Sequence, residues 1–217
     1  MAKSSQAAVE LKNDWRADRN NELSELLRGK ILDAARACLK KNDYAKLRMD
    51  MIAREAGCSR GTLYRYFASK EEILLNIAIG NYQHIAIQVA EAISKIKDPR
   101  LRFATGLTRA MALAVKEDNL STLNMDMINR AMVTDPKTLN QTVAVSLAPY
   151  FEAAEAEGLL RAGTDLQETS EWIIQSSNGL LNTGWPNVGG KLLNEKQQVD
   201  YLCRYLLYPV FDMRDIV

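Results

Sequence analysis

Residues 49–74 read MDMIAREAGCSRGTLYRYFASKEEIL, and the rest of the chain is interpreted outward from this stretch. The apolar residues from Met49 to Ala56 recur at the i, i+3, i+4, i+7 spacing of one helix face, which predicts a short helix. Gly57 follows, and glycine adopts the left-handed backbone conformation of a helix stop without a steric penalty. We therefore expect the first helix of this stretch to end at Gly57.

A second and a third helix follow in the same stretch. Ser59 is placed to cap the second helix, in which Leu63 and Phe67 lie on one inward face. The sequence Ser69-Lys70-Glu71-Glu72 has the pattern of a capping box and opens the third helix. Two short helices joined by a glycine turn form the helix-turn-helix pattern, whose second helix fits the major groove of DNA.

The outward residues of the second helix all donate hydrogen bonds, and none of them is acidic. Such a surface suits DNA phosphates and base edges, and Lys70 adds a cation at the start of the next helix. A solvated helix surface explains any one of these residues but explains the whole set less well. The residues that we expect to contact DNA are Arg48, Ser59, Arg60, Thr62, Tyr64, Arg65, Tyr66 and Lys70.

This stretch resembles the DNA-binding domain of the TetR family of bacterial transcriptional regulators. The matching motifs are Ile52-Ala53, Ala56-Gly57, Ser59, Gly61-Thr62-Leu63-Tyr64, Tyr66-Phe67 and Ser69-Lys70-Glu71. The resemblance covers about residues 27–75, and beyond them the chain is similar to the family only in length and helical character. Leu47-Arg48 departs from the Thr or Ser that the family often has there, which removes a cap and a phosphate contact. Cys58 stands where Val is usual.

The resemblance implies a regulator, more often a repressor than an activator, that binds a palindromic DNA operator as a homodimer. It also implies that the last two helices, about residues 166–182 and 195–212, form the dimer interface, and that the body encloses an effector pocket. Two apolar helices at the end of a chain are otherwise ordinary core. A two-fold pair of heads one helical turn apart reads a palindrome, which a single head does not.

Soft apolar side chains in the body fit a pocket for a small, mostly hydrophobic effector, because methionine adapts to irregular space. Ordinary core packing is the alternative for each of them. The candidate ligand-binding residues are Tyr82, His84, Phe103, Met111, Met125, Met132, Trp172 and Gln175.

Composition excludes several classes of protein. Of the 217 residues, 47% are hydrophobic and 25% charged, as in ordinary globular proteins, and no apolar run approaches the ~18 residues of a membrane span. The N-terminus has no apolar signal-peptide core, and the three cysteines are widely spaced. We therefore expect a cytoplasmic protein with no membrane segment, metal site or cofactor.

The charge is unevenly distributed along the chain. Residues 1–70 hold 15 Lys and Arg against 9 Asp and Glu, while residues 71–217 hold 13 against 18. A basic N-terminal third that coincides with the helix-turn-helix suits a DNA-binding head on a separate body.

The periodicity predicts an all-α fold with three parts. Residues 1–22 are expected to be a flexible arm, residues 23–70 a three-helix DNA-binding head, and residues 71–217 a body for effector binding and dimerisation. The head begins with a helix over 24–42 capped by Ser24, and a long helix over about 69–95 joins head to body. Further helices are expected at about 100–116, 119–134, 136–157, 166–182 and 195–212.

Two other functions compete with this interpretation. A helical interaction or scaffold protein without DNA binding has the same composition, and only a DNA-binding measurement separates the two. An enzyme is disfavoured because the lone His84 has no catalytic companion, and the sequence has no nucleophile elbow, HExxH motif or phosphate loop.

Overall fold

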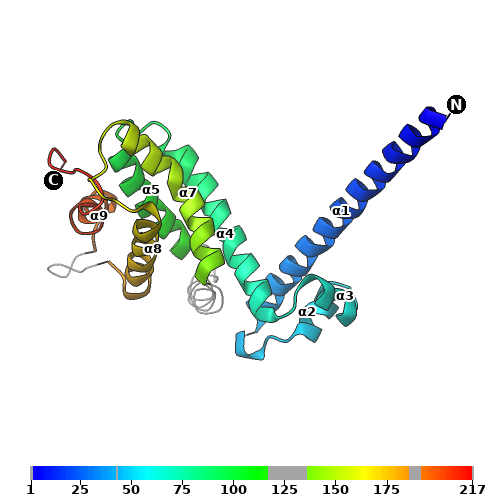
Figure 1. Cartoon of the computed structure of the whole chain (residues 1–217). Coiled ribbons are helices and arrows are strands. Elements are labelled where there is room, and N and C mark those ends of the chain that lie inside the picture. Colours follow the sequence, from blue (N-terminus) through cyan, green and yellow to red (C-terminus); the bar gives the residue numbers. More distant parts are fainter. Residues whose placement is uncertain (1, 43, 117–135, 186–191, 217) are drawn as a thin grey trace. The chain divides into compact units, whose positions relative to one another are not determined.

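The structure is a computed structural model that describes residues 2–42, 44–116, 136–185 and 192–216 (Figure 1). Within these residues the chain is helical, with one isolated β-bridge between Leu160 and Phe211 and no strand, which confirms the predicted all-α class. The chain forms two compact units, Met1–Ile73 and Leu74–Val217. The helix predicted at 119–134 lies outside the described residues.

The first unit is a small helical head. It contains α1 (Ala2–Lys41), the 3₁₀ turn η1 (Tyr44–Lys46), α2 (Met49–Glu55), α3 (Arg60–Tyr66) and the start of α4 (Lys70–Ile93). Helix α1 packs against α2, and α2 packs against α3. The fully buried side chains of this core include Ile31, Leu47, Ile52, Leu63 and Phe67.

The first helix is much longer than predicted. It begins at Ala2, so the expected start near Ser24 is wrong, and Ser24 is an interior helix residue rather than an N-cap. The physical reason is that residues 2–28 contain neither glycine nor proline and are rich in Ala, Glu, Lys, Arg and Leu, which favour helix. The flexibility expected for residues 1–22 concerns motion and stays a prediction.

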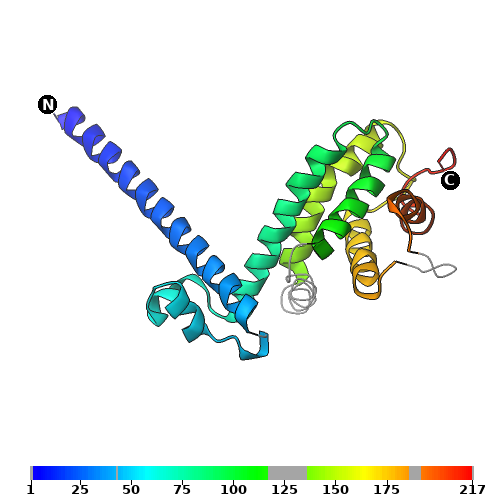
Figure 2. The ribbon, with the colours of Figure 1, turned by 180° about the vertical axis from the view of Figure 1, so that it is seen from behind.

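The second unit is a helical body (Figure 2). It contains the rest of α4, α5 (Pro99–Lys116), α7 (Pro136–Ala156), α8 (Leu166–Thr183), α9 (Glu195–Leu202) and the π-helix η3 (Cys203–Leu207). Helix α5 is central, because it contacts α7, α8, α9 and η3. Phe103, Phe151 and Phe211 meet in its core, with ring centroids 5.6–5.9 Å apart.

The ends of the body helices follow local rules with one exception. Pro136 begins α7 as predicted, and Asp165 caps α8 by accepting from the Glu168 N–H at 2.8 Å. The expected α-helix over 195–212 is wrong, because α-helical geometry stops at Leu202 and continues as the π-helix. Beyond the π-helix, the N–H groups of Val210 and Phe211 still donate to the Leu207 carbonyl. The chain then pairs with residues 159–161, because the Arg161 N–H donates to the Val210 carbonyl and the Asp212 N–H donates to the Leu159 carbonyl.

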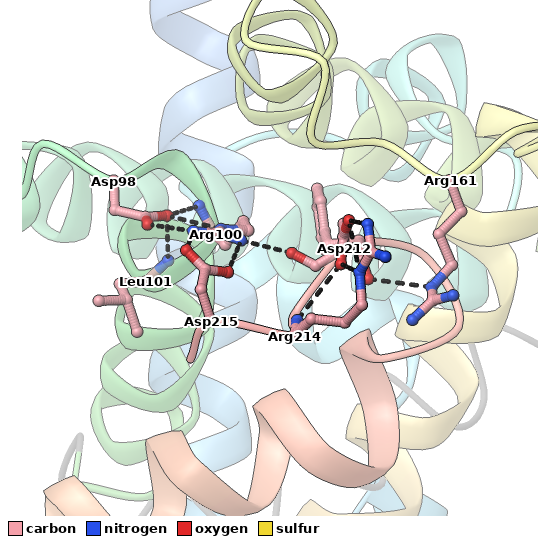
Figure 3. Close-up of polar contacts among 8 residues, drawn as sticks. Asp98, Arg100, Leu101, Arg161, Asp212, Arg214 and Asp215 are labelled. Atoms are coloured by element: carbon pink, nitrogen blue, oxygen red, sulfur yellow. Dashed lines mark hydrogen bonds and ion pairs between the residues drawn. The ribbon is translucent and has the colours of Figure 1, made fainter. Parts of the chain in front are cut away.

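A buried arginine ties the C-terminal segment to the α4–α5 connection (Figure 3). Arg100 is 4% exposed and donates to both carboxylate oxygens of Asp98 and of Asp215, at 2.6–3.1 Å. It also donates to the backbone carbonyl of Asp212. The hydrogen bonds from Arg100 hold the pKa of Asp98 below its usual value.

We expect Arg100→Met to lower the free energy of unfolding by about 2–3 kcal/mol, the scale of hydrogen bonds to charged groups. Because the folded pKa of Asp98 is lowered, its contribution is present above the unfolded value of about 3.9 and is lost as the pH falls through the folded value. Urea unfolding at pH 7 and pH 3 measures this. The gap between wild type and variant should shrink at pH 3, and an equal gap at both would contradict the assignment.

Candidate DNA-binding surface and ligand cavity

Helix α3 is held in place from both ends and from beneath. Gly57, with a φ of +67°, makes the turn after α2, and Ser59 caps α3 by accepting from the Thr62 N–H at 3.0 Å. Leu63 and Phe67 are fully buried and anchor the helix to the head. The predicted cap and inward face of this helix are therefore confirmed, and the remaining side chains must face outward.

The outward side of α3 is formed by Arg60, Thr62, Tyr64, Arg65 and Tyr66, which we call the recognition face. Arg60 and Arg65 are exposed, and so is Tyr64 at 48%, whereas Thr62 and Tyr66 are half-buried. The Arg65 guanidinium lies 5.6 Å from the centre of the Tyr66 ring. No residue of α3 is acidic, so the face presents donors without a competing carboxylate.

The other predicted DNA contacts lie at the edges of this face. The Ser59 hydroxyl lies 2.9 Å from the Thr62 hydroxyl, so it already forms a hydrogen bond within the first turn of α3. Arg48 stands at the N-cap position of α2 without a side-chain cap bond, and its exposed guanidinium pairs with Asp50 at 3.3 Å. An arginine paired with a carboxylate at the surface remains accessible to a phosphate, because such pairs are weak.

Lys70 has an internal role that its sequence position did not indicate. Its Nζ donates to the carbonyls of Leu47 at 3.2 Å and Tyr44 at 3.4 Å, and it lies 4.2 Å from the centre of the Tyr44 ring. The Tyr44 hydroxyl in turn donates to Glu71 at 2.6 Å. Lys70 therefore fastens the connection before α2 to the first turn of α4, which leaves less of its ammonium for a phosphate.

The body encloses a cavity of about 460 Å³ lined by α4, α5, α7 and α8. Its walls are mostly apolar side chains. Gly106 on α5 is one of the wall residues. A Cβ at this position would lie 2.9 Å from Ile93 Cδ1, so glycine allows α5 to approach α4 closely. The polar residues among the described walls are Asn81, Tyr82, Ser146, Tyr150, Ser177 and Asn178.

The structure brings together only some of the predicted ligand residues. Tyr82, Phe103 and Met111 line the cavity. The residues that do not line it are His84, which is exposed and bonds to Gln88 at 2.6 Å, and the exposed Trp172 and Gln175. Met125 and Met132 lie outside the described residues. Sequence reasoning missed Ser146, Tyr150 and Ser177, because the type of a single helical residue does not show which face of the helix it occupies.

The tyrosines of the cavity are neutral at physiological pH. Burial raises the pKa of Tyr82 to about 12, and its hydroxyl is hydrogen-bonded to Ser146. Burial also raises the pKa of Tyr150. Among the described residues that line the cavity, none is Asp, Glu, Lys, Arg or His, so the described walls carry no charge.

The described part of the chain contains neither a membrane-spanning helix nor a cluster of metal-binding side chains. No helix there is long and apolar enough to cross a membrane, and no group of three or more His, Cys, Asp or Glu is arranged to hold a metal ion. The three cysteines are free, and burial raises the pKa of Cys203 to about 11.

Comparison with known proteins agrees with the geometry of the head. Residues 31–77 match the family model of bacterial regulatory proteins, tetR family. An uncharacterized HTH-type transcriptional regulator of Mycobacterium tuberculosis is 27% identical over 175 residues, which are 77% of this chain and 79% of that protein. The HTH-type transcriptional repressor KstR of Rhodococcus jostii is 30% identical over 155 residues, 67% of this chain and 64% of that protein.

A solved structure shares the fold over most of the chain. RolR in complex with the ligand resorcinol superposes with a TM-score of 0.60 at 16% identity, over 84% of this chain and 88% of that one. The head, its recognition face and these relatives define a DNA-binding transcriptional regulator of the helix-turn-helix class. Residues 31–77 form a domain of the tetR family of bacterial regulatory proteins, and over most of its length the chain is similar to a transcriptional regulator of the helix-turn-helix type.

Proposed function

We propose that this protein is a cytoplasmic repressor that binds a palindromic operator as a homodimer and is released by a small, mostly hydrophobic effector. The observation that carries the proposal is the recognition face. It offers five hydrogen-bonding side chains on one short helix, held outward by buried Leu63 and Phe67 and without any carboxylate. Surfaces of this kind position a helix on phosphates and read base edges.

The dimer interface of the proposal is formed by α8, α9 and η3. Trp172 on α8 is 50% exposed, Tyr205 on η3 is 67% exposed, and Tyr208 follows at 44%. Large aromatic side chains are common in the centres of protein interfaces, where they are covered by the partner. Two-fold pairing at this surface supplies the symmetric pair of heads that a palindrome requires.

The effector acts in this proposal through α4. This helix contributes cavity walls from Ala78 to Ala90, and the same helix begins at Lys70, beside the head residues Tyr44 and Leu47. A ligand that favours one tilt of α4 biases the separation of the two heads, of which one separation matches successive major grooves. A coupling of about 1–3 kcal/mol weakens operator binding roughly 5- to 150-fold.

Binding to DNA fragments that flank its own gene tests the proposal. Fluorescence anisotropy should show binding that weakens steeply with salt, because phosphate neutralisation releases counterions. We expect Arg60→Ala to cost about 1–3 kcal/mol on the preferred fragment and to reduce the preference over unrelated DNA.

Arg214→Ala is the matched control for this experiment. It removes an exposed arginine of the second unit that pairs with Asp212, so operator affinity should not change. Equal affinity of the wild type and Arg60→Ala for every fragment would reject the recognition face as the DNA-binding surface.

A further inference from the structure

The ligand cavity contains one buried hydroxyl whose hydrogen bond is unaccounted for. Ser177 lies on α8, lines the cavity and is 7% exposed. Within the part of the chain that the structure describes, its Oγ has no hydrogen-bond partner. A buried polar atom without a partner is costly and uncommon in native proteins, so it calls for a functional explanation.

Four other polar residues of the cavity already take part in interactions. The Tyr82 hydroxyl bonds to Ser146, and the Ser146 hydroxyl donates to the Thr142 carbonyl at 3.2 Å. Asn81 and Asn178 also take part in other interactions. Ser177 therefore offers a hydroxyl that can donate to a ligand or accept from it without breaking an existing bond.

The charge of the cavity limits what it can hold. Its described walls carry no ionised side chain, and burial keeps Tyr82 and Tyr150 protonated by raising the pKa of each. A carboxylate, sulfonate or phosphate that entered would lose its hydration and find no cation on these walls, which is strongly unfavourable. A neutral molecule that is mostly apolar loses little by entering.

We propose that Ser177 is a specificity-determining residue of this cavity, and that the cavity takes uncharged, mainly apolar molecules whose single hydroxyl or amine group hydrogen-bonds to the Ser177 Oγ. This inference rests on the effector-responsive function proposed above and names the chemical class of the effector. It assigns the same cavity a preference for neutral over anionic ligands of equal size.

The test uses the neutral dye N-phenyl-1-naphthylamine, whose fluorescence rises in apolar sites. We expect saturable binding to the full-length protein in the absence of DNA. Three competitors share one ring system and differ in one group: 2-naphthol, naphthalene and 2-naphthoate. At pH 7, 2-naphthol should displace the dye at concentrations about 3- to 10-fold lower than naphthalene, the value of one net hydrogen bond. The anionic 2-naphthoate should be the weakest competitor.

Two variants assign the preference to one atom. Ser177→Ala should bring 2-naphthol and naphthalene to equal displacing concentrations while the dye still binds. Ser176→Ala, the neighbouring serine of α8 that does not line the cavity, should keep the wild-type ratio. The unfolding temperature of ligand-free Ser177→Ala should be equal to or above that of wild type, because the change removes an unpaired buried hydroxyl.

Three results would overturn the inference: no saturable dye binding, displacement by 2-naphthoate at or below the concentration of 2-naphthol, or a 2-naphthol preference that survives Ser177→Ala. None of these measurements involves DNA. A failure of this inference is therefore distinct from a failure of operator binding, which the anisotropy titration detects separately.

Discussion

Tyr205→Asp should convert the protein from a dimer to a monomer and lower its operator affinity by about two to four orders of magnitude. Tyr205 is 67% exposed on η3, so the change leaves the core of the isolated chain intact. In the proposed interface, however, the substitution introduces a carboxylate that dimerisation would bury. The carboxylate would lose its hydration without gaining a cation from the partner. Loss of the second head then removes the gain of roughly 10²- to 10⁴-fold that linking two binding modules provides.

Sedimentation velocity and operator titration measure the two halves of this prediction. Val145→Asp is the matched control, because Val145 is 74% exposed on α7 and lies outside the proposed interface. It should remain dimeric and bind the operator as wild type does. A Tyr205→Asp protein that sediments as a dimer would place the interface elsewhere on the surface.

Phe151→Ala should lower the free energy of unfolding of the body by about 3–5 kcal/mol, the range for removing a buried aromatic side chain. Phe151 is 1% exposed on α7, and its ring lies 5.6 Å from that of Phe103 and 5.9 Å from that of Phe211. It therefore joins α7 to α5 and to the C-terminal segment, and its loss leaves a cavity at their junction.

Urea unfolding monitored by circular dichroism gives the size of this effect. Glu152→Ala on the same helix is the control, because Glu152 is exposed and alanine favours helix. Its stability should stay within about 0.5 kcal/mol of wild type. A similar small loss in Phe151→Ala would mean that the three rings do not stabilise the body as their burial indicates.

The head was the part most accessible to sequence reasoning. The ends of its helices depend on residues within three or four positions of each other. Ser59 caps α3 through the Thr62 N–H, and Gly57 forms the turn after α2. Its inward face follows from the spacing of Leu63 and Phe67, both of which are buried. Local rules were insufficient for α1, because the absence of a breaker before Ser24 outweighed the cap that Ser24 offered.

The cavity shows the opposite case. Phe103 and Met111 were candidates because they are soft and apolar, and both line it, but Trp172 has the same character and lies exposed on α8. Ser177 gave no signal at all, since a serine on a helix is ordinary until the surrounding helices remove its water and its partners. Lys70 likewise seemed free for DNA until folding placed the carbonyls of Tyr44 and Leu47 within its reach.

The amino-acid sequence by itself determined the helical class, the helix-turn-helix and the chemistry of its outward side, because these depend on short-range spacing and on side-chain type. The tertiary structure alone decided which polar groups surround the cavity, how Arg100 holds a segment more than 100 residues away, and where the last α-helix continues as a π-helix. The physical reason is that each of these features depends on contacts between groups that are far apart in the sequence and that exclude water from one another. The spacing of residues along the chain does not show which distant groups meet.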